Sequence, residues 1–414
     1  MSEIKQLFTG IPFFVLQLIL CIVGFQSDSI AVFKTAAALI LVYCILEGSQ
    51  QKYIINPYYL LIITPISLLM YLNIGNAFFL NLTSDTWLLI ICNIDALLIG
   101  LAYTRSTHYR ERRLNKIYSQ KLYTKTAWIF TVLGVIPPVI YRFTGVIIPL
   151  AYIITMLGVA GVMAANATQK KKLIIPIIVI YIFPILLGGA SKTGVLTLLL
   201  ALIISYEKFY VKIIDIKSLK KVHKRIIIGC IMAIPIMISA FTFANKERGS
   251  YDATDNLKYF SPRVEWSYDA AYFMPYMYIT TPWANLQYVI ETQDRRSYGY
   301  WLTKPILGPI LGDEFLKKEY IPESYSAFNT FSFIGLHFKD FGYWGSLLMS
   351  LFLGFFIKKV YSLYAVSSLP YDAASYVFTA QATLELFFSN HFFGQSYPFM
   401  IVIVMYLFKK LMKI

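Results

Sequence analysis

The stretch ILLGGASKTGVLTLLLALI (185–203) contains one lysine, Lys192, between two apolar runs. A lysine at the centre of a bilayer costs roughly 2.5 to 3.5 kcal/mol on insertion scales, so its presence here needs a reason. We expect GGASKTG (188–194) to be a turn at the membrane surface that joins two membrane-spanning helices. Lys192 would then lie at the membrane face and not in the hydrocarbon.

Apolar runs of similar length recur along the whole chain. Of its 414 residues, 57% are hydrophobic and 14% are charged, and the mean hydropathy is +0.60. These values predict an all-α, polytopic membrane protein. The formal net charge is +15, but the basic residues form short clusters between apolar runs, as in loops at an anionic cytoplasmic leaflet. A nucleic-acid partner is therefore not expected.

About twelve candidate membrane helices follow from these runs. About nine form an N-terminal bundle at 1–243 and about three a C-terminal bundle at 340–414, with a long loop at 244–339 between the bundles. The candidates lie near 9–26, 30–47, 57–75, 85–103, 126–142, 146–165, 173–189, 193–207, 226–243, 340–357, 373–389 and 397–409.

Clusters of lysine and arginine set the orientation of these helices. Under strict alternation all the clusters fall on one side, which the positive-inside rule assigns to the cytoplasm. Both termini are then cytoplasmic, while Lys192 and the loop at 244–339 are external. The clusters are the loops at 104–125 and 207–225, the run at 169–173, the pair Lys358 and Lys359, and the C-terminal KKLMKI.

The external loop at 244–339 is long and rich in tyrosine and tryptophan, so we expect it to be ordered and functional. Its stretch at 301–320 is amphipathic and predicts helices along the membrane interface. The loop carries Arg248 and Arg263, with Glu265 close behind. Arginine suits phosphate because its planar fork donates two parallel hydrogen bonds, so a diphosphate can be bound here without a metal. The alternative is that these charges are solvated and form weak surface pairs.

Aromatic residues of the loop, such as Trp266 and Tyr268, can stack on sugar rings or form an interfacial aromatic belt. The loop has no Asp-x-Asp pair, and His337 has no neighbouring metal ligand. The four cysteines of the chain lie in apolar segments without metal-type spacing. Neither a metal nor another cofactor is therefore expected.

Two acidic residues fall inside predicted spans, Asp95 in the fourth and Glu385 in the eleventh. Acids within a membrane are functional candidates, because their burial is expensive. Glu385 is near the predicted outer end of its span, where we expect it to face a reaction cavity. We expect Asp95 to pair with a polar group inside the bundle.

Four short motifs resemble those of one family of membrane enzymes. FNTFSF (328–333) and KDFGYWGSLLMSLFLG (339–354) resemble the Asn-Thr, Asp-Phe-Gly and spaced-glycine pattern of Wzy-type oligosaccharide repeat-unit polymerases. GGASKTG (188–194) is similar to the Ser-Arg-Thr/Ser-Gly turn of that family, and YITTPWANL (278–286) to its Tyr-x-x-(Ser/Thr)-Pro segment. The motifs occur in the family's order, between about 180 and 360, while the first half of the chain matches in hydropathy alone.

The resemblance implies an all-helical membrane glycosyltransferase of the GT-C-like type, in the bacterial cytoplasmic (inner) membrane with its active site facing the periplasm. Such enzymes move a growing glycan from undecaprenyl diphosphate to a sugar hydroxyl of another undecaprenyl-diphosphate-linked oligosaccharide. The product is an O-antigen, a capsule or another exopolysaccharide. The partners implied are the lipid bilayer, the lipid-linked substrates, a chain-length regulator and a flippase.

Fixed cations beside the leaving diphosphate stabilise the transition state more than the ground state, because negative charge develops there as the glycosidic bond breaks. We expect Lys192, Arg248 and Arg263 to supply this charge, and Arg263 to be essential for chain growth. The family usually has arginine at the position of Lys192. A lysine neutralises phosphate as a point charge, without bidentate geometry.

The attacking hydroxyl needs a proton acceptor or an orienting hydrogen bond. Asp340 can instead cap the tenth helix, and His337 can instead be an interfacial packing residue. The candidate acceptors, in order of preference, are Asp340, Glu265, His337 and Asp269, and the expected glycan contacts are Tyr268, Trp266 and Asn329, of which Asn329 can also terminate a turn.

Two other functions use the same substrates. A flippase or transporter of lipid-linked oligosaccharide would also have many spans, but transporters often contain paired halves, and no internal repeat is visible in this sequence. An O-antigen ligase shares the donor chemistry, but its motif begins His-Asn where this chain has Phe328 and Asn329. We therefore expect a polymerase.

Overall fold

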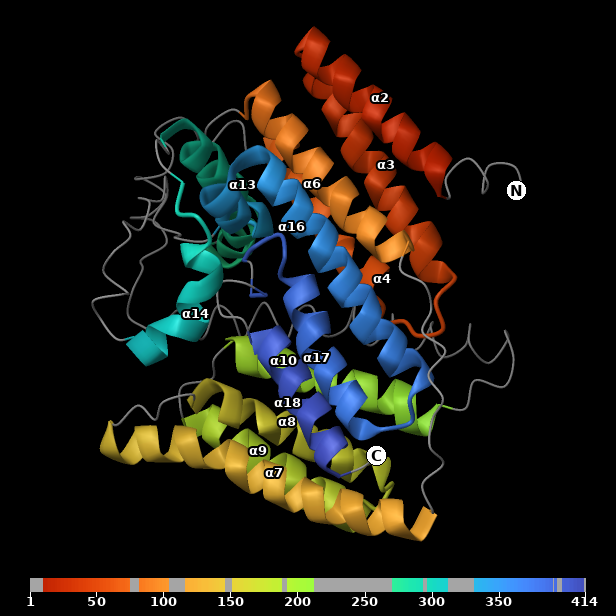
Figure 1. Ribbon diagram of the computed structural model, residues 1–414, viewed down its shortest axis with the longest axis vertical. Helices are drawn as coiled ribbons and strands as arrows, with labels where there is room; N and C mark the ends of the chain where they lie inside the picture. Colours follow the sequence, from red (N-terminus) through yellow and green to blue (C-terminus); the bar gives the residue numbers. More distant parts are fainter. Residues whose placement is uncertain are drawn as a thin grey trace. The chain divides into compact units, whose positions relative to one another are not determined.

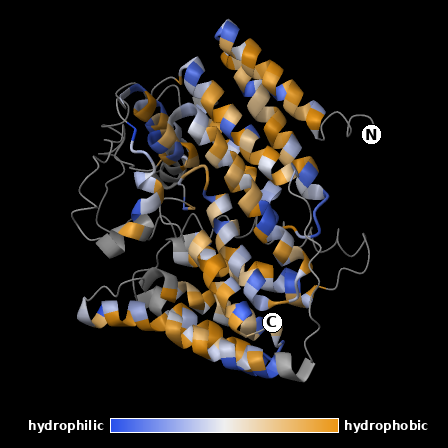
Figure 2. Ribbon diagram, viewed as in Figure 1, coloured by the Kyte–Doolittle hydropathy of each residue, from blue (hydrophilic) through white to orange (hydrophobic). Residues whose placement is uncertain are grey.

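The computed structural model describes residues 10–74, 82–103, 116–145, 151–187, 192–211, 270–292, 296–311, 331–389, 391–392 and 397–412 (Figure 1). Every regular element in these ranges is a helix, which confirms the all-α class for the described part of the chain. Hydrophobic residues cover much of these helices (Figure 2). Four of the described helices are long and apolar enough to cross a membrane: Ile30–Ser49, Ser84–Tyr103, Gln120–Thr144 and Phe333–Val366.

Three shorter helices are also apolar: Ile11–Ser27, Pro57–Tyr71 and Ile154–Ala167. Together with the four longer helices they agree with the predicted membrane protein. The predicted number of twelve spans stays a prediction, and the span expected at 226–243 lies outside the described residues.

Most described helices begin and end within a few residues of the predicted spans. The span predicted at 57–75 consists of two helices, α4 (Pro57–Leu61) and α5 (Ile63–Ile74). Asn56 caps α4, because its side-chain oxygen accepts a hydrogen bond from Tyr59 N at 3.1 Å. The helices that match closely are α2 (Ile11–Ser27), α3 (Ile30–Ser49), α6 (Ser84–Tyr103), α8 (Ala151–Ala167), α9 (Lys171–Leu187), α10 (Lys192–Ser205), α17 (Pro370–Leu384) and α18 (Tyr397–Leu411).

Helix α7 (Lys116–Thr144) begins well before the predicted span at 126–142. Residues 116–125, which were expected in a basic loop, belong to this helix. The prediction of a loop at 116–125 was wrong because hydropathy marks where the apolar part of a helix ends. The helix itself can continue into water as long as its backbone hydrogen bonds continue. Lysine and glutamine are also good helix formers, so the helix continues through them.

The described helices form two compact units, each assembled from separate parts of the chain. The predicted division at 1–243, 244–339 and 340–414 concerns order along the chain and stays a prediction. The first unit comprises Met1–Arg105, Ser250–Lys359 and Ala382–Ser396, and the second comprises Ser106–Gly249, Val360–Gln381 and Tyr397–Ile414.

In the first unit, α6 and α16 (Phe333–Val366) touch backbone to backbone. A Cβ atom on Gly354 would lie 2.1 Å from Leu97 O, and one on Gly100 would lie 2.4 Å from Leu351 O. Small residues allow such close approach in membrane proteins. Gly354 belongs to the motif at 339–354, so its packing role accounts for part of that pattern without any chemistry.

A polar ladder runs beside this contact. Asn93 Nδ2 donates to Ser346 Oγ at 3.2 Å, and Ser350 Oγ donates to Asn93 Oδ1 at 2.7 Å. All three residues are buried. The ladder fixes the register of α6 against α16, because the buried amide and hydroxyls satisfy one another.

The predicted external loop contains two described helices, α13 (Ala270–Thr292) and α14 (Tyr300–Leu311). Helix α13 packs on α5: the buried Trp283 donates from Nε1 to Ser67 Oγ at 2.7 Å, and Ser67 Oγ donates to Ile279 O at 2.6 Å. The segment YITTPWANL is therefore part of a packed helix. Helix α14 covers the first part of the amphipathic stretch predicted at 301–320.

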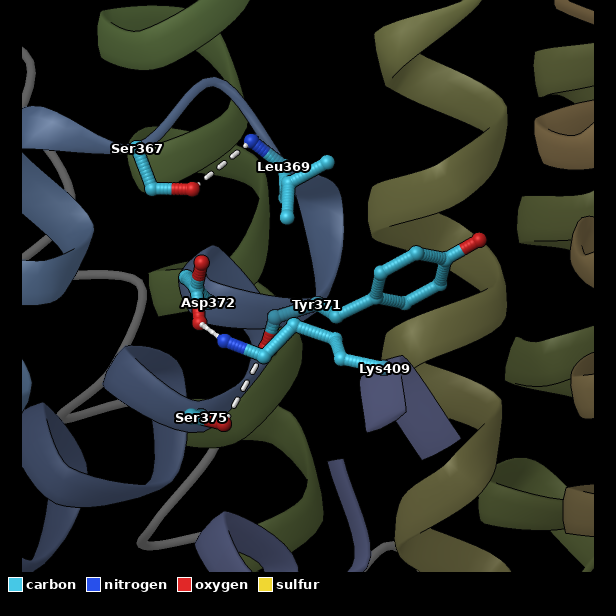
Figure 3. A network of polar contacts seen from close by, with 6 residues as sticks. All are labelled: Ser367, Leu369, Tyr371, Asp372, Ser375 and Lys409. Carbon is cyan, nitrogen blue, oxygen red and sulfur yellow. Dashed lines mark hydrogen bonds and ion pairs between the residues drawn. The ribbon is translucent and has the colours of Figure 1, made fainter. Parts of the chain in front are cut away.

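In the second unit, α7, α8 and α9 pack on one another, and α10 and α18 contact α8. Helices α17 and α18 share a buried ion pair, in which Lys409 Nζ donates to Asp372 Oδ1 (Figure 3). Nearby, Ser375 Oγ donates to Tyr371 O at 3.1 Å, and Tyr371 and Phe408 pack edge to face at 5.0 Å. The pair anchors the end of α18 to the beginning of α17.

Candidate functional site

The candidate site begins at a sharp bend inside α16. Gly342 has φ 70° and ψ −160°, so the helix is interrupted between its first turns and the long apolar part. Only glycine adopts this conformation without strain. A Cβ atom at position 342 would also lie 3.1 Å from Arg296 Cζ. The conformation therefore favours glycine in the Asp-Phe-Gly motif, and a side chain there would also press on the Arg296 guanidinium.

The segment before α14 is bonded to the segment before this bend. Ser297 N donates to Lys339 O at 3.2 Å, and Tyr298 N donates to Asp340 O at 3.1 Å. Arg296 Nη1 donates to Phe338 O at 3.1 Å. The chain around 296–300, from the predicted external loop, therefore lies directly against the Lys-Asp-Phe-Gly sequence.

Asp340 joins the two segments with its side chain. Its Oδ1 accepts from Ser297 Oγ at 2.8 Å and from Trp301 N at 3.1 Å, and its Oδ2 accepts from Leu302 N at 3.0 Å. A carboxylate that binds the first N–H groups of a helix caps that helix. Asp340 therefore caps α14. The sequence offered Asp340 as a cap of the tenth predicted helix, but the helix that it caps is α14.

Three cations surround the aromatic rings of this region. Lys304 Nζ and Lys339 Nζ lie 4.4 and 4.5 Å from the ring centroid of Trp301. Arg296 Cζ lies 4.6 Å from the ring centroid of Phe338. We call Arg296, Lys304 and Lys339 the cationic cluster.

Asp340 follows Lys339 in the chain, and its carboxylate binds the first turn of α14, the helix that carries Lys304. Lys339 is only 6% exposed, and its ammonium lies on an aromatic face. Cation–π contacts help to hold the two lysines over the ring of Trp301. The cluster therefore brings three basic side chains into one region of the first unit.

His337 lies one helical turn before the bend and is buried. Its ring packs edge to face on Phe333 at 6.3 Å. This environment fits the expected alternative of a packing residue. The role of His337 as a proton acceptor stays a prediction.

A second pair of titratable groups lies in the same unit. Glu385 directly follows α17, and its Oε2 is 3.1 Å from His391 Nε2. Leu386 O accepts a hydrogen bond from Phe333 N at 2.9 Å, so the turn after α17 is tied to the beginning of α16. The sequence singled out Glu385 but gave no sign of its partner.

Asp95 lines an apolar cavity of about 410 Å³ in the first unit, together with Cys21 and Cys92. The residue is 9% exposed, and among the described residues none donates a hydrogen bond to its Oδ1. The polar partner expected for this oxygen is therefore not found within the described part of the chain.

Most of the predicted site residues cannot be compared with this geometry. Lys192 is the first residue of α10 and belongs to the second unit, and α9 ends at Leu187, in agreement with two helices around the predicted turn. Asp340 and His337 fall within one helix of the first unit. Arg248, Arg263, Glu265, Trp266, Tyr268, Asp269 and Asn329 lie outside the described residues.

The cationic cluster was not predicted. Lys339 stands next to Asp340 in the motif at 339–354, but the motif itself assigns no role to this lysine. Arg296 and Lys304 flank the aromatic sequence SYGYWLT (297–303), which is one of many aromatic stretches in the loop. Trp301 with Lys304 three residues later was the one sign of this cluster that the sequence contained.

Within the described ranges, no group of three or more histidine, cysteine, aspartate or glutamate side chains is placed to hold a metal ion. Comparison of the chain with protein-family models, with curated protein sequences and with solved structures gives no match. The function is therefore inferred from the sequence motifs and the geometry of the site.

Proposed function

We propose that this chain is a bacterial membrane glycosyltransferase that polymerises undecaprenyl-diphosphate-linked oligosaccharide repeat units. The observation that carries the proposal is the cationic cluster beside the Asp-Phe-Gly bend, where Arg296, Lys304 and Lys339 lie on the aromatic rings of Phe338 and Trp301. The motif that resembles the polymerase family and the cations that suit its substrate meet at one place. The enzyme needs no metal in this proposal.

The proposed reaction exchanges one glycosidic bond for another. A sugar hydroxyl oxygen of one lipid-linked unit attacks the anomeric carbon of the growing glycan. The bond from that carbon to the diphosphate oxygen breaks, and its electron pair leaves with undecaprenyl diphosphate. The attacking hydroxyl gives its proton to a base, so one repeat is added in each reaction.

The cationic cluster acts on the leaving group. Charge increases on the diphosphate as the bond breaks, so cations that are already in place favour the transition state over the ground state. Arg296 offers a planar fork for two phosphate oxygens, and Lys304 and Lys339 act as point charges. From the sequence alone, the proposal also assigns Lys192, Arg248 and Arg263 to binding the diphosphate and gives Arg263 a part in the chemistry.

Asp340 has a positioning role. Its two oxygens hold the beginning of α14 and thereby fix Lys304 and Trp301 beside Lys339. Glycan contacts from Tyr268, Trp266 and Asn329 complete the proposed site. The finer architecture, about twelve spans in a GT-C-like arrangement with cytoplasmic termini and a periplasmic site, belongs to the same proposal.

Reconstitution of the purified protein with undecaprenyl-diphosphate oligosaccharide, in the presence of a chelator, tests the function. A ladder of glycans with release of undecaprenyl diphosphate is the expected result. Transfer of intact substrate across vesicles without a ladder would instead identify a flippase. Transfer of a finished glycan to a different acceptor would identify a ligase.

Two variants test the cationic cluster in the same assay. Arg296→Gln and Lys304→Gln should each reduce the rate of chain growth at least tenfold, because each removes a cation from the leaving group. Arg142→Gln and Lys410→Gln change exposed cations of α7 and α18 and serve as matched controls. Equal rates for the cluster variants and the controls would exclude the cluster from the site.

A further inference from the structure

The apolar cavity beside Asp95, of about 410 Å³, has no role in the proposed reaction. Two helices that pack on each other, α2 and α6, form most of its wall, and Leu347 of α16 adds to it. All the lining residues belong to the first unit. Those from α2 are Ile11, Phe14, Val15, Leu18 and Cys21, and those from α6 are Cys92, Asp95, Ala96, Ile99 and Tyr103.

The cavity is open to an apolar surface. On both helices the lining positions recur mostly at intervals of three and four residues, so each helix contributes one face. Val15 and Leu18 line the cavity and are also 50% and 57% exposed on the outer side of the apolar helix α2. A molecule dissolved in the hydrocarbon of a membrane can therefore enter without crossing water.

Asp95 is the one carboxylate among the lining residues. The residue is largely buried, and its Oδ1 accepts no hydrogen bond from any residue that the structure describes. A buried acceptor without a donor is unfavourable, and more so in an apolar medium. The thiols of Cys21 and Cys92 hydrogen-bond to each other, and a thiol is a weak donor, so they are poor substitutes for a hydroxyl group.

The volume of the cavity limits the size of a ligand. An apolar cavity of about 150 Å³ holds one benzene ring. By the same proportion, the cavity beside Asp95 has room for roughly fifteen carbon atoms. A ligand of this size would be apolar along most of its length and would have one polar end at Asp95.

The chemistry of the wall selects among possible occupants. A water molecule needs about two to four polar partners, and the wall offers few besides Asp95. The polyprenyl chain of a lipid-linked substrate is a hydrocarbon, so it would leave Oδ1 without a donor. An amine would bring a second charge into an apolar wall, which is costly. A hydroxyl group donates to Oδ1 and brings no charge.

We propose that the cavity between α2 and α6 is a binding site for a membrane-soluble alcohol of about fifteen carbons, whose hydroxyl donates to Asp95. The apolar body of the alcohol packs against the faces of α2 and α6. This site is separate from the cationic cluster and does not depend on the proposed reaction.

Thermal unfolding of the full chain in lipid nanodiscs tests the proposal. Farnesol, an isoprenoid alcohol of this size, should raise the melting temperature at a fixed mole fraction in the lipid, because it binds the native state. Pentadecanol distinguishes a straight body from a branched one, and stabilisation by either alcohol supports the site. Farnesene, which has no hydroxyl, should bind about tenfold more weakly, since it leaves Oδ1 without a donor.

Two pairs of variants locate the effect. Asp95→Leu should bind farnesol and farnesene alike, whereas Asp85→Leu, at an exposed position of the same helix, should keep the preference for farnesol. Leu18→Trp fills the cavity and should abolish the stabilisation by farnesol. Ile19→Trp is its matched control, because Ile19 is similarly exposed on α2 but does not line the cavity.

Carbodiimide labelling locates the ligand in the wild-type protein. Dicyclohexylcarbodiimide modifies carboxyl groups in apolar surroundings, and mass spectrometry of peptides measures the rate at each residue. Farnesol should slow the modification of Asp95 several-fold and leave that of Asp85 unchanged. This measurement does not require any variant to fold.

Four results would overturn the proposal. Equal stabilisation by farnesol and farnesene would show that the cavity takes hydrocarbon chains, and stronger stabilisation by farnesylamine would show that it selects a cation. Failure of both alcohols to stabilise the protein, or unchanged labelling of Asp95, would remove the site. Chain growth is not needed in these assays, so this inference and the proposed function can fail separately.

Discussion

Asp340 shows how one side chain can hold a site together without reacting. Its carboxylate accepts three hydrogen bonds, one from the hydroxyl of Ser297 and two from backbone N–H groups at the start of α14. Without Asp340, these donors would have to bind water instead. Buried polar groups that satisfy one another are costly to break, because one partner is left unpaired. The residue is therefore a sensitive point for the local structure.

Asp340→Asn should loosen α14 without unfolding the protein. An amide has a single acceptor oxygen and no negative charge to interact favourably with the N-terminal end of the helix dipole. We therefore expect the stability of α14 to fall by about 1 kcal/mol. Hydrogen exchange at residues 300–311 should become faster. Asp85→Asn, in the first turn of α6, is the control, and equal exchange in both variants would contradict the capping role.

The ion pair of Lys409 and Asp372 gives a second prediction at this scale. Lys409→Met leaves a buried carboxylate without its cation, which typically costs about 3 to 5 kcal/mol. The melting temperature in detergent should fall clearly, and Asp372→Asn should restore part of the loss in the double variant. Lys410→Met, at the exposed neighbouring position, should melt like the wild type.

Elements meet most closely where α6 crosses α16. Gly100 and Gly354 leave no space for a side chain, so the distance between these helices is set by their backbones. The buried ladder from Asn93 to Ser346 and Ser350 then sets their register. Close contact and register together hold the long part of α16 in place behind the bend.

Gly354→Ala should force the two helices apart. The added methyl group would meet Leu97 O, and overpacking of this kind costs about 1 to 3 kcal/mol. We expect a lower melting temperature and weaker chain growth together, because the bend at Gly342 belongs to the same helix. Ala102→Val adds bulk on an exposed position of α6, and a similar effect there would show that helix spacing is not the cause.

At this scale the sequence was a good guide to helices and a poor guide to what joins them. Hydropathy located α3 and α6 within a few residues, because a run of apolar side chains is needed to face lipid. It did not reveal the pairing of residues 296–298 with 338–340. That pairing uses backbone groups, which every residue carries, so it leaves no mark in residue type.

At the scale of the whole molecule, the prediction to test is which side of the membrane each loop faces. The positive-inside rule places Lys192 outside and the run at 169–173 inside. In a variant without the native cysteines, Lys192→Cys should react with an impermeant maleimide added to intact cells. Lys170→Cys should react only after the membrane is opened, and labelling of both positions from one side would contradict the topology.

The sequence pointed to single residues and not to the contacts between them. It predicted cations at Lys192 and in the loop at 244–339, Asp340 from the Asp-Phe-Gly motif, and Glu385 as an acid inside an apolar run. The cationic cluster and the pairing with His391 depend on contacts between distant segments, which one sequence does not contain. Position along the chain could not show that Lys304 and Lys339 share one tryptophan.

The cap on α14 also has a consequence for how the protein is made. Trp301 leaves the ribosome 39 residues before Asp340, the side chain that receives its N–H group. A nascent chain that stops short of residue 340 must carry this helix with its first turn open. These N–H groups can be capped in this way only once Asp340 has been made, so truncated chains that end before position 340 should be cut by proteases around residue 300 while full-length chains resist.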